Sequence, residues 1–235
     1  MVTGTKGGLH MCGRFTLTAP VDQLMDRFDV EFFLQEEEYL PSYNVAPSQS
    51  VLAVINNGAH NKMGFLRWGL IPPWAKDISI GYKMINARAE TLTEKPSFRN
   101  AYKKKRCLIV ADSFYEWKRI DSKTKTPMRI KLKSDELFAM AGLWESWKSP
   151  EGKSIFSCSV ITTQPNELVQ DIHDRMPVIL KPEDEKFWLD SSITDTTKLQ
   201  HLLKPLDQRL MEVYEVSPLV NSPKNNSIEL IQKIC

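Results

Sequence analysis

The sequence lacks any hydrophobic run that approaches the ~20 apolar residues needed to cross a bilayer. Residues 1–10 also lack the apolar centre of a secretory signal. The four cysteines, Cys12, Cys107, Cys158 and Cys235, form no CxxC pair and are too few for a disulfide framework. We therefore expect a cytoplasmic protein with no membrane contact.

An excess of charge of one sign is also missing. The 31 Lys and Arg residues against 29 Asp and Glu residues leave a net charge of +2, so the overall charge identifies no partner. A hydrophobic content of 42% indicates a globular chain rather than a disordered one. The length allows one large domain or two small ones, but no repeat, linker or composition shift divides the sequence, so we expect one domain.

Metal-ligand spacing is absent as well. The candidate ligands are the four cysteines and His10, His60, His173 and His201. Their positions show none of the short intervals that hold zinc in sequence motifs. We expect no metal and no cofactor.

Residues 1–10 favour neither helix nor strand, because three of them are glycine and few are apolar. The codons of residues 6–8 can form the purine-rich tract of a bacterial ribosome-binding site before Met11. We hypothesise that residues 1–10 are a non-native or mis-annotated extension and that translation starts at Met11. Removal of Met11 would then leave Cys12 with a free α-amine.

Hydrophobic periodicity predicts short elements along the rest of the chain. Helices are expected at 21–28, 97–105, 165–172, 183–189 and 195–204, and strands at 50–56, 107–110, 128–133 and 156–163. Regular crossover helices do not separate the strands. We therefore expect an α+β fold: a single domain with a mainly antiparallel, barrel-like β core flanked by short helices. Residues 222–235 are expected to form a polar, partly disordered tail.

Cys12 is the candidate nucleophile. An N-terminal cysteine carries an amine with a pKa near ~8 and a thiol with a pKa near ~8.5 on adjacent carbons. Such a 1,2-aminothiol condenses with an aldehyde to an imine, and the sulfur then closes a thiazolidine ring. The alternative is a buried, unreactive cysteine, which is the commoner case.

Two further residues suit proton transfer. His173 lies in a polar stretch that ends at Pro177, although a structural or surface role is the commoner one for a single histidine. Glu116 directly follows an apolar strand and lies between two aromatic residues, where burial would raise its pKa. An exposed glutamate at the end of a strand is the alternative.

The segment from Arg67 to Trp74 is rich in Trp, Gly and Pro and therefore indicates an irregular loop. We expect Trp74 to fill a corner of the core. The alternative is a surface on which the bases of single-stranded nucleic acid stack.

Eight short motifs occur in a fixed order. They are Met11–Phe15, Tyr43–Pro47, Arg67–Leu70, Asn86–Thr91, Phe114–Trp117, Gly142–Trp144, Ile161–Thr163 and His173–Pro177. Together they resemble the SRAP family (SOS response-associated peptidase) over residues 11–221. The chain departs from the family in residues 1–10, because the family's chemistry requires its cysteine at the mature N-terminus.

The resemblance implies a sensor of abasic sites in single-stranded DNA during the DNA damage or SOS response. Cys12 would form a covalent thiazolidine crosslink with the ring-opened sugar and so shield the lesion. Asn86 would hold the sugar or the Cys12 backbone, Glu116 would act as acid and base, and His173 would assist ring opening and closure. The family name also implies a peptidase, in which Cys12 would release itself from Met11.

The same resemblance assigns residues that bind DNA. Arg14, Arg88 and Arg175 are the expected phosphate contacts, and a local group of arginines needs no large net charge. Trp68, Pro47 and Trp117 are the candidates for stacking or wedging against bases. The protein is expected to be a monomer in the bacterial cytoplasm, associated with the nucleoid when bound to DNA. The alternatives are a cysteine peptidase that acts on other proteins and a non-covalent reader of single-stranded DNA.

Overall fold

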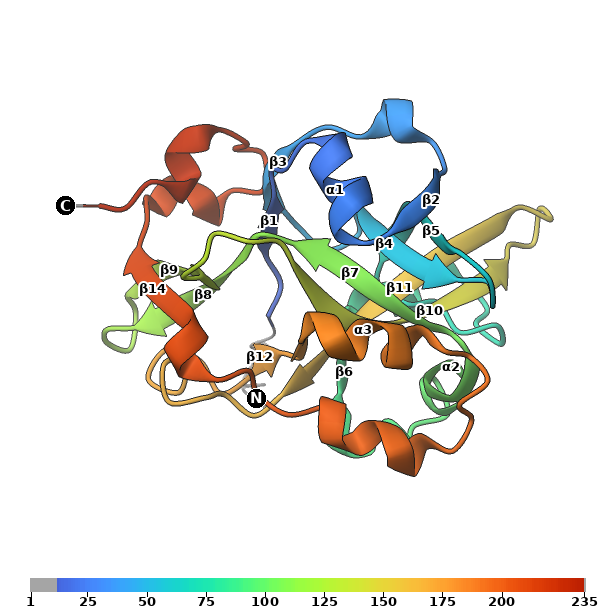
Figure 1. The fold of residues 1–235 in the computed structure, drawn as a ribbon. Helices are drawn as coiled ribbons and strands as arrows, with labels where there is room; N and C mark the ends of the chain where they lie inside the picture. The colour runs from blue at the N-terminus through green and yellow to red at the C-terminus, as the bar shows by residue number, and fades with distance from the viewer. Residues whose placement is uncertain (1–11, 235) are drawn as a thin grey trace, which may run out of the picture.

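A closed ring of five strands forms the centre of the fold in the computed structural model, which describes residues 12–234 (Figure 1). The ring runs β11 (Ser154–Thr163), β10 (Phe138–Lys148), β7 (Arg106–Ala111), β4 (Ser50–Asn56) and β5 (Asn61–Trp68). Neighbouring strands are antiparallel, and a parallel pairing of β5 with β11 closes the ring. The expected α+β fold with a barrel-like core is confirmed.

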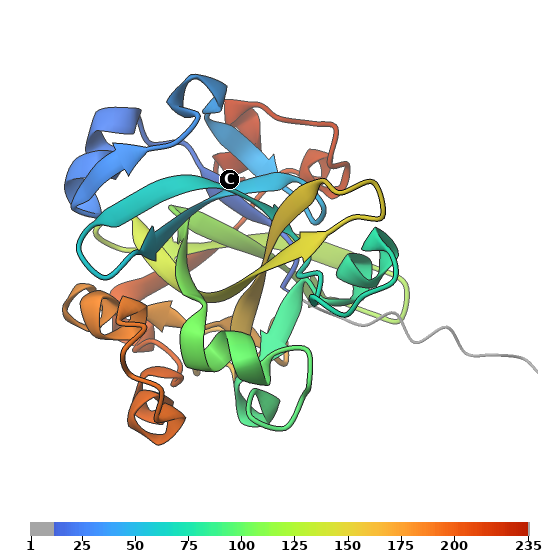
Figure 2. The same cartoon turned by 90° about the vertical axis from the view of Figure 1, so that its right-hand side faces the viewer.

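A second sheet packs beside this barrel. Its order is β14 (Met211–Glu215), β9 (Lys125–Leu132), β8 (Ser113–Arg119), β1 (Phe15–Leu17) and β3 (Ser42–Val45). Shorter strands extend the barrel sheet, namely β2 (Val30–Phe33), β6 (Asn86–Arg88), β12 (Met176–Pro177) and β13 (Ile179–Leu180). The long β10–β11 hairpin, coloured yellow, projects beyond the other strands in Figure 1 and faces the viewer in Figure 2.

Short helices cover one side of the barrel. They are α1 (Val21–Arg27), α2 (Arg99–Lys104) and α3 (Pro182–Leu189). The connections between elements contain the 3-10 turns η1 (Glu36–Glu38), η2 (Ile78–Lys83), η3 (Ala89–Thr91), η4 (Thr196–Leu202), η5 (Gln208–Leu210), η6 (Pro218–Asn221) and η7 (Ile228–Ile231). With α3 at eight residues, no helix within 12–234 has the length and hydropathy to cross a membrane.

The alternation of side chains along the barrel strands produces two apolar cores. Leu108 and Val110 of β7 join the cluster beneath the helices, which also holds Trp188 of α3. Cys107 and Ile109 point the other way, into the cluster that packs on the second sheet. All six residues of β7 are therefore buried.

Two of the expected α-helices, at 165–172 and 195–204, are not α-helical in the structure. Residues 165–172 make hydrogen-bonded turns because the Asn166 side chain binds the Val169 amide and the Leu206 carbonyl, which fixes the segment locally. Residues 196–202 form the 3-10 turn η4, which begins at an Asp195 cap. The proposed extension 1–10 and Met11 lie outside the described residues.

The expectation of a partly disordered tail is wrong for residues 222–234. Leu230 of η7 is fully buried with Tyr115 and Val220, and its carbonyl accepts a hydrogen bond from the Tyr115 hydroxyl at 3.3 Å. Asn226 accepts the Tyr43 amide of β3 at 2.7 Å. The red C-terminal segment accordingly lies against β3 (Figure 1).

Replacement of Leu230 by Ala is expected to lower the free energy of unfolding by about 2–4 kcal/mol, because a fully buried leucine leaves a cavity. Urea unfolding measures the loss. The matched control is Ile228→Ala, whose side chain is 57% exposed and should change stability by less than about 0.5 kcal/mol. Equal stabilities of the two variants would contradict the packed position of this segment.

Candidate active site

Cys12 lies just before β1, with its side chain turned into the protein and 6% of the residue exposed. Its thiol donates to the carbonyl oxygen of Arg175 at 3.4 Å. Its own carbonyl oxygen accepts a hydrogen bond from Asn86 Nδ2 at 2.9 Å. Because Asn86 belongs to β6 and Arg175 directly precedes β12, two strands that flank β11 fix the position of Cys12.

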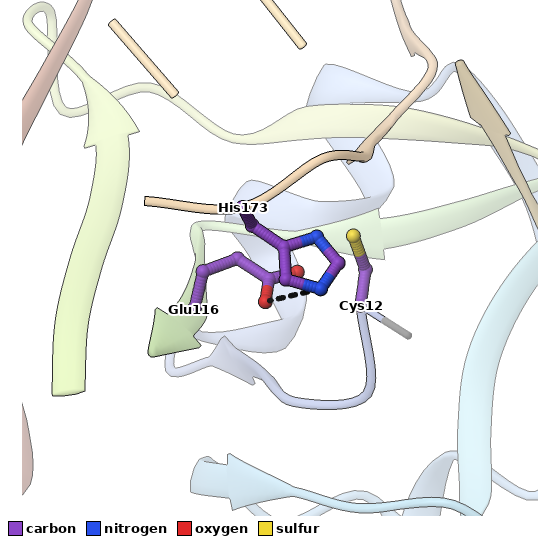
Figure 3. A group of neighbouring side chains, drawn as sticks. All are labelled: Cys12, Glu116 and His173. Carbon is purple, nitrogen blue, oxygen red and sulfur yellow. Dashed lines mark ion pairs between the residues drawn. The ribbon is translucent and has the colours of Figure 1, made fainter. Parts of the chain in front are cut away.

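Glu116 and His173 face Cys12 from two other segments (Figure 3). Glu116 lies on β8, and His173 lies in the turn before β12. His173 Nε2 is 3.8 Å from Glu116 Oε2, and one ligand atom from each of the three side chains lies within 4.8 Å of the others. The structure thus brings together all four residues expected to do chemistry.

The thiol and the carboxyl group of this cluster are both held in their protonated forms. The pKa of Glu116 is raised to about 8, chiefly by burial, with the Cys12 thiol opposing the shift and the neighbouring Asp174 adding to it. Burial and the proximity of Glu116 raise the pKa of the Cys12 thiol well above its ordinary value. At neutral pH, Glu116 is therefore a neutral acid that can donate a proton.

The orientation of the His173 ring depends on the backbone of Arg175. Its Nδ1 lies 3.0 Å from the Arg175 carbonyl oxygen and 3.1 Å from the Arg175 amide nitrogen. The ring can therefore donate to the carbonyl in one tautomer or accept from the amide in the other. This arrangement suits a histidine that exchanges a proton at Nε2.

Three buried polar atoms around Cys12 have no hydrogen-bond partner among residues 12–234. They are Asn86 Oδ1, Glu116 Oε1 and Arg175 Nε. A buried polar atom without a partner costs about 1–3 kcal/mol, so native proteins rarely keep one without a use for it. These polar atoms, grouped beside a nucleophile, provide hydrogen-bonding places for a polar substrate.

The three arginines expected to bind phosphate differ in their surroundings. Arg88 is exposed on β6, on the same side of this short strand as Asn86. Arg175 is 14% exposed and forms a bidentate ion pair with Glu90, and it also donates to the Thr162 carbonyl at 2.5 Å. Arg88 thus has a free surface, whereas Arg175 already has a carboxylate in the position of a phosphate.

Arg14 binds other parts of the protein through its guanidinium group. Its guanidinium donates to Asn44 Oδ1 and the Val220 carbonyl, both at 2.7 Å, and to the Asn221 carbonyl at 3.2 Å. These bonds tie the Cys12 segment to the C-terminal part of the chain. Three of the five N–H groups of Arg14 therefore bind the protein, and the expected phosphate contact stays a prediction for the rest of this half-exposed guanidinium.

The expectation that Trp68 stacks on bases is wrong. Its ring is 2% exposed, packs against Phe15 at 5.1 Å between centroids, and donates Nε1–H to the Ile85 carbonyl. Trp68 ends β5 on the same face as the buried Leu66, and this period-2 spacing was a signal of burial in the sequence.

Trp74 is exposed, although it was expected in the core. It is 59% exposed in the loop that follows Gly69, and Tyr82 of η2 is exposed to the same extent. Gly69 has a φ of +127°, and a Cβ there would lie 2.6 Å from the Gly81 carbonyl oxygen. Only glycine allows this close approach, which shapes the loop.

The other two candidates for base contact are partly exposed. Trp117 follows Glu116 on β8, donates Nε1–H to Asn221, and has the Arg14 guanidinium 5.8 Å from its ring centroid. It also lines a surface pocket of about 180 Å³ with His173, Arg119 and Lys125. Pro47 lies in the turn between β3 and β4.

The fold and the site define a β-barrel protein in which a cysteine, a carboxyl group and an imidazole converge, with the exposed Arg88 on the neighbouring strand β6. Residues 11–223 match the family model described as SOS response associated peptidase (SRAP). This chain belongs to the SRAP family.

Individual relatives agree with this assignment. The abasic site processing protein YoqW of Bacillus subtilis (strain 168) is 65% identical over 222 residues, which cover 94% of this chain and 99% of the relative. The abasic site processing protein HMCES of Rattus norvegicus is 30% identical and covers 94% of this chain and 75% of its own length. The crystal structure of a Bacteroides thetaiotaomicron protein matches with a TM-score of 0.86 at 28% identity, covering 95% of this chain and 100% of that one.

Proposed function

We propose that this protein detects abasic sites in single-stranded DNA and crosslinks to them through Cys12. The observation that carries the proposal is the convergence of Cys12, Asn86, Glu116 and His173 from four separate segments. The names of the relatives, which are abasic site processing proteins, support DNA with abasic sites as the target. The match of the family model from residue 11 onward supports a working chain that starts near Cys12.

The proposed reaction forms two bonds and releases one water. The α-amine of Cys12, freed by removal of Met11, attacks the aldehyde carbon of the ring-opened deoxyribose to give a carbinolamine. Loss of the hydroxyl group as water gives an imine. The nitrogen of this imine keeps its hydrogen and is therefore positively charged. The Cys12 sulfur then adds to the imine carbon, the thiol proton passes to the Glu116 carboxylate, and a thiazolidine ring closes.

Each neighbouring side chain has a proposed task in these steps. Glu116, neutral at pH 7, donates the proton that lets the carbinolamine hydroxyl leave as water, and its carboxylate then takes the thiol proton. His173 exchanges a proton with the sugar ring oxygen during opening. Asn86 holds the Cys12 carbonyl, and its unpartnered Oδ1 is available for a sugar hydroxyl.

The same centre is the candidate for self-processing. Cys12, Glu116 and His173 are the nucleophile, acid and base that cleavage of the Met11–Cys12 peptide bond would need. Intact-mass measurement of the Glu116→Gln and His173→Gln variants tests this step. Retention of Met11 in these variants, with its loss in the parent, is expected for self-processing.

A crosslinking gel tests the proposed function. The form that begins at Cys12 is expected to give a heat-stable, slowly migrating band with single-stranded DNA that carries an abasic site. DNA of the same sequence without the lesion is the control and should give no band. The 235-residue chain with residues 1–11 retained should also give none, because its Cys12 nitrogen is an amide. Equal bands with intact DNA, or none with the lesion, would refute the crosslinker.

Arg88→Ala is expected to weaken the binding of single-stranded DNA without abolishing crosslinking. The loss of one phosphate contact should reduce the slope of log affinity against log salt by about 0.7. Fluorescence anisotropy at several salt concentrations, on DNA without a lesion, measures this slope. The matched control is Lys186→Ala on α3, an exposed cation on the helix that packs on β7 and β10. Identical slopes for the two variants would contradict the role of Arg88.

A further inference from the structure

We propose that Cys12, Glu116 and His173 also form a zinc site, and that bound Zn²⁺ keeps the reactive cysteine in a blocked state. This inference rests on the proposed function, since it concerns the same nucleophile. Among residues 12–234, these three side chains are the group whose ligand atoms could hold a metal ion. Sequence spacing did not indicate it, because the ligands come from three distant segments.

The geometry is close to that of a tetrahedral zinc centre. Bonds of about 2.0 Å to nitrogen and oxygen and about 2.3 Å to sulfur place the ligand atoms roughly 3.3–3.8 Å from one another. His173 Nε2 and Glu116 Oε2 are 3.8 Å apart, and all three ligand atoms lie within 4.8 Å. Small side-chain rotations would therefore complete the site.

The surroundings of His173 match those of a metal-bound imidazole. Zinc-binding histidines use one ring nitrogen for the metal and donate the other N–H to a carbonyl or carboxylate. His173 Nδ1 is 3.0 Å from the Arg175 carbonyl oxygen, and Nε2 is the ring nitrogen that lies 3.8 Å from Glu116 Oε2. The Arg175 side chain is itself fixed by Glu90 and Thr162, so this carbonyl is held in place.

The donor set selects the class of metal. A thiolate and an imidazole favour zinc over magnesium or calcium, which prefer oxygen ligands. Zn²⁺ would replace the thiol proton of Cys12 and the carboxyl proton of Glu116, and both protons would pass to solvent. In the form that begins at Cys12, the α-amine supplies a fourth ligand and closes a five-membered chelate ring with the sulfur.

Zinc binding and crosslinking exclude each other chemically. The thiazolidine uses the nitrogen and sulfur of Cys12, which are the two atoms of the chelate. The metal-bound protein therefore cannot condense with an aldehyde until the ion is removed. A blocked aminothiol would also be protected from oxidation and from unrelated aldehydes.

The test is a titration with Zn²⁺ or Co²⁺ of the form that begins at Cys12, with the 235-residue chain in parallel. We expect one equivalent to bind the shorter form, a thiolate-to-cobalt absorption band, and weaker binding to the 235-residue chain. Cys12→Ser and His173→Gln should each weaken binding at least roughly 100-fold, because even outer-shell substitutions cost 10–100-fold. The control Cys158→Ala removes a buried barrel thiol and should bind as the parent does.

The crosslinking gel separates this inference from the proposed function. The zinc-loaded protein should give no band, and a chelator should restore it. Absence of binding, binding unchanged by Cys12→Ser in a variant that is folded by circular dichroism, or crosslinking by the zinc-loaded protein at the metal-free rate would overturn the zinc site. If the protein binds zinc but the metal-free form gives no crosslink, the zinc site stands and the proposed function fails.

Discussion

Cys12→Ala, prepared with residue 12 at the N-terminus, is expected to lose the heat-stable crosslink completely. The variant retains an α-amine, so it still forms an imine with the abasic aldehyde, but it has no sulfur to close the ring. An imine hydrolyses on heating. The gel should therefore show no band without a reductant and a band after borohydride treatment, which converts the imine to a stable amine.

The contrast between these two bands assigns separate roles to the amine and the sulfur. Cys158→Ala is the matched control, because it removes another buried thiol and should crosslink at the parent rate. A full-strength heat-stable band from Cys12→Ala would remove the thiazolidine from the mechanism. Loss of the borohydride-dependent band as well would instead point to a different nucleophile than the α-amine.

The residues proposed to do chemistry stand out in the sequence because their local settings are unusual. Glu116 interrupts an aromatic stretch after a fully apolar strand, and the structure buries it to 2% exposure. Cys12 stands out because it directly follows Met11 in the first of the eight motifs. Burial of a carboxyl group at such a position is costly, so a use for it was a reasonable inference.

The surface contacts were harder to predict, because they depend on partners far away in the sequence. Nothing near Arg14 indicates that its donors bind the carbonyls of Val220 and Asn221, more than 200 residues later. Nor does the motif around Arg175 show that Glu90 holds its guanidinium. The family resemblance named these arginines as phosphate contacts, and only the fold shows which other parts of the chain their guanidinium groups bind.

The burial of Trp68 and Trp74 was also hard to predict from the sequence. Trp68 and Trp74 lie in one segment rich in Gly and Pro, and the composition of that segment does not tell which ring is buried. The strand register of β5 places Trp68 inside, whereas Trp74 follows the turn at Gly69 and is exposed. The exposed Trp74 is therefore a better stacking candidate than Trp68.

Glu116→Gln is expected to slow crosslink formation by about 10²–10⁴-fold, the usual contribution of a positioned acid or base. Gln has a similar shape but cannot exchange a proton. The parent should show a bell-shaped dependence on pH. The rate rises as the α-amine, with an ordinary pKa of about 7.7–8.0, loses its proton. It then falls as Glu116 ionises near pH 8. In the variant the falling limb should disappear, and single-turnover rates between pH 6 and 10 measure both effects.

Glu116→Gln should gain stability relative to the parent as pH rises, although it crosslinks more slowly. The pKa of Glu116 is raised in the folded state, so the unfolded chain loses its proton at a lower pH than the folded one does. The contribution of this group to stability is therefore complete below its unfolded pKa and is lost as pH rises toward about 8. Glu116→Gln does not suffer this loss, so urea unfolding should show that the variant becomes more stable relative to the parent as the pH rises from 5 to 9.

Glu145→Gln is the matched control for the rate prediction. Glu145 is a buried carboxylate in the β10–β11 hairpin that pairs with Lys105, and its replacement should leave the bell-shaped rate profile unchanged. A loss of the falling limb in that control, or its persistence in Glu116→Gln, would show that another group is the acid.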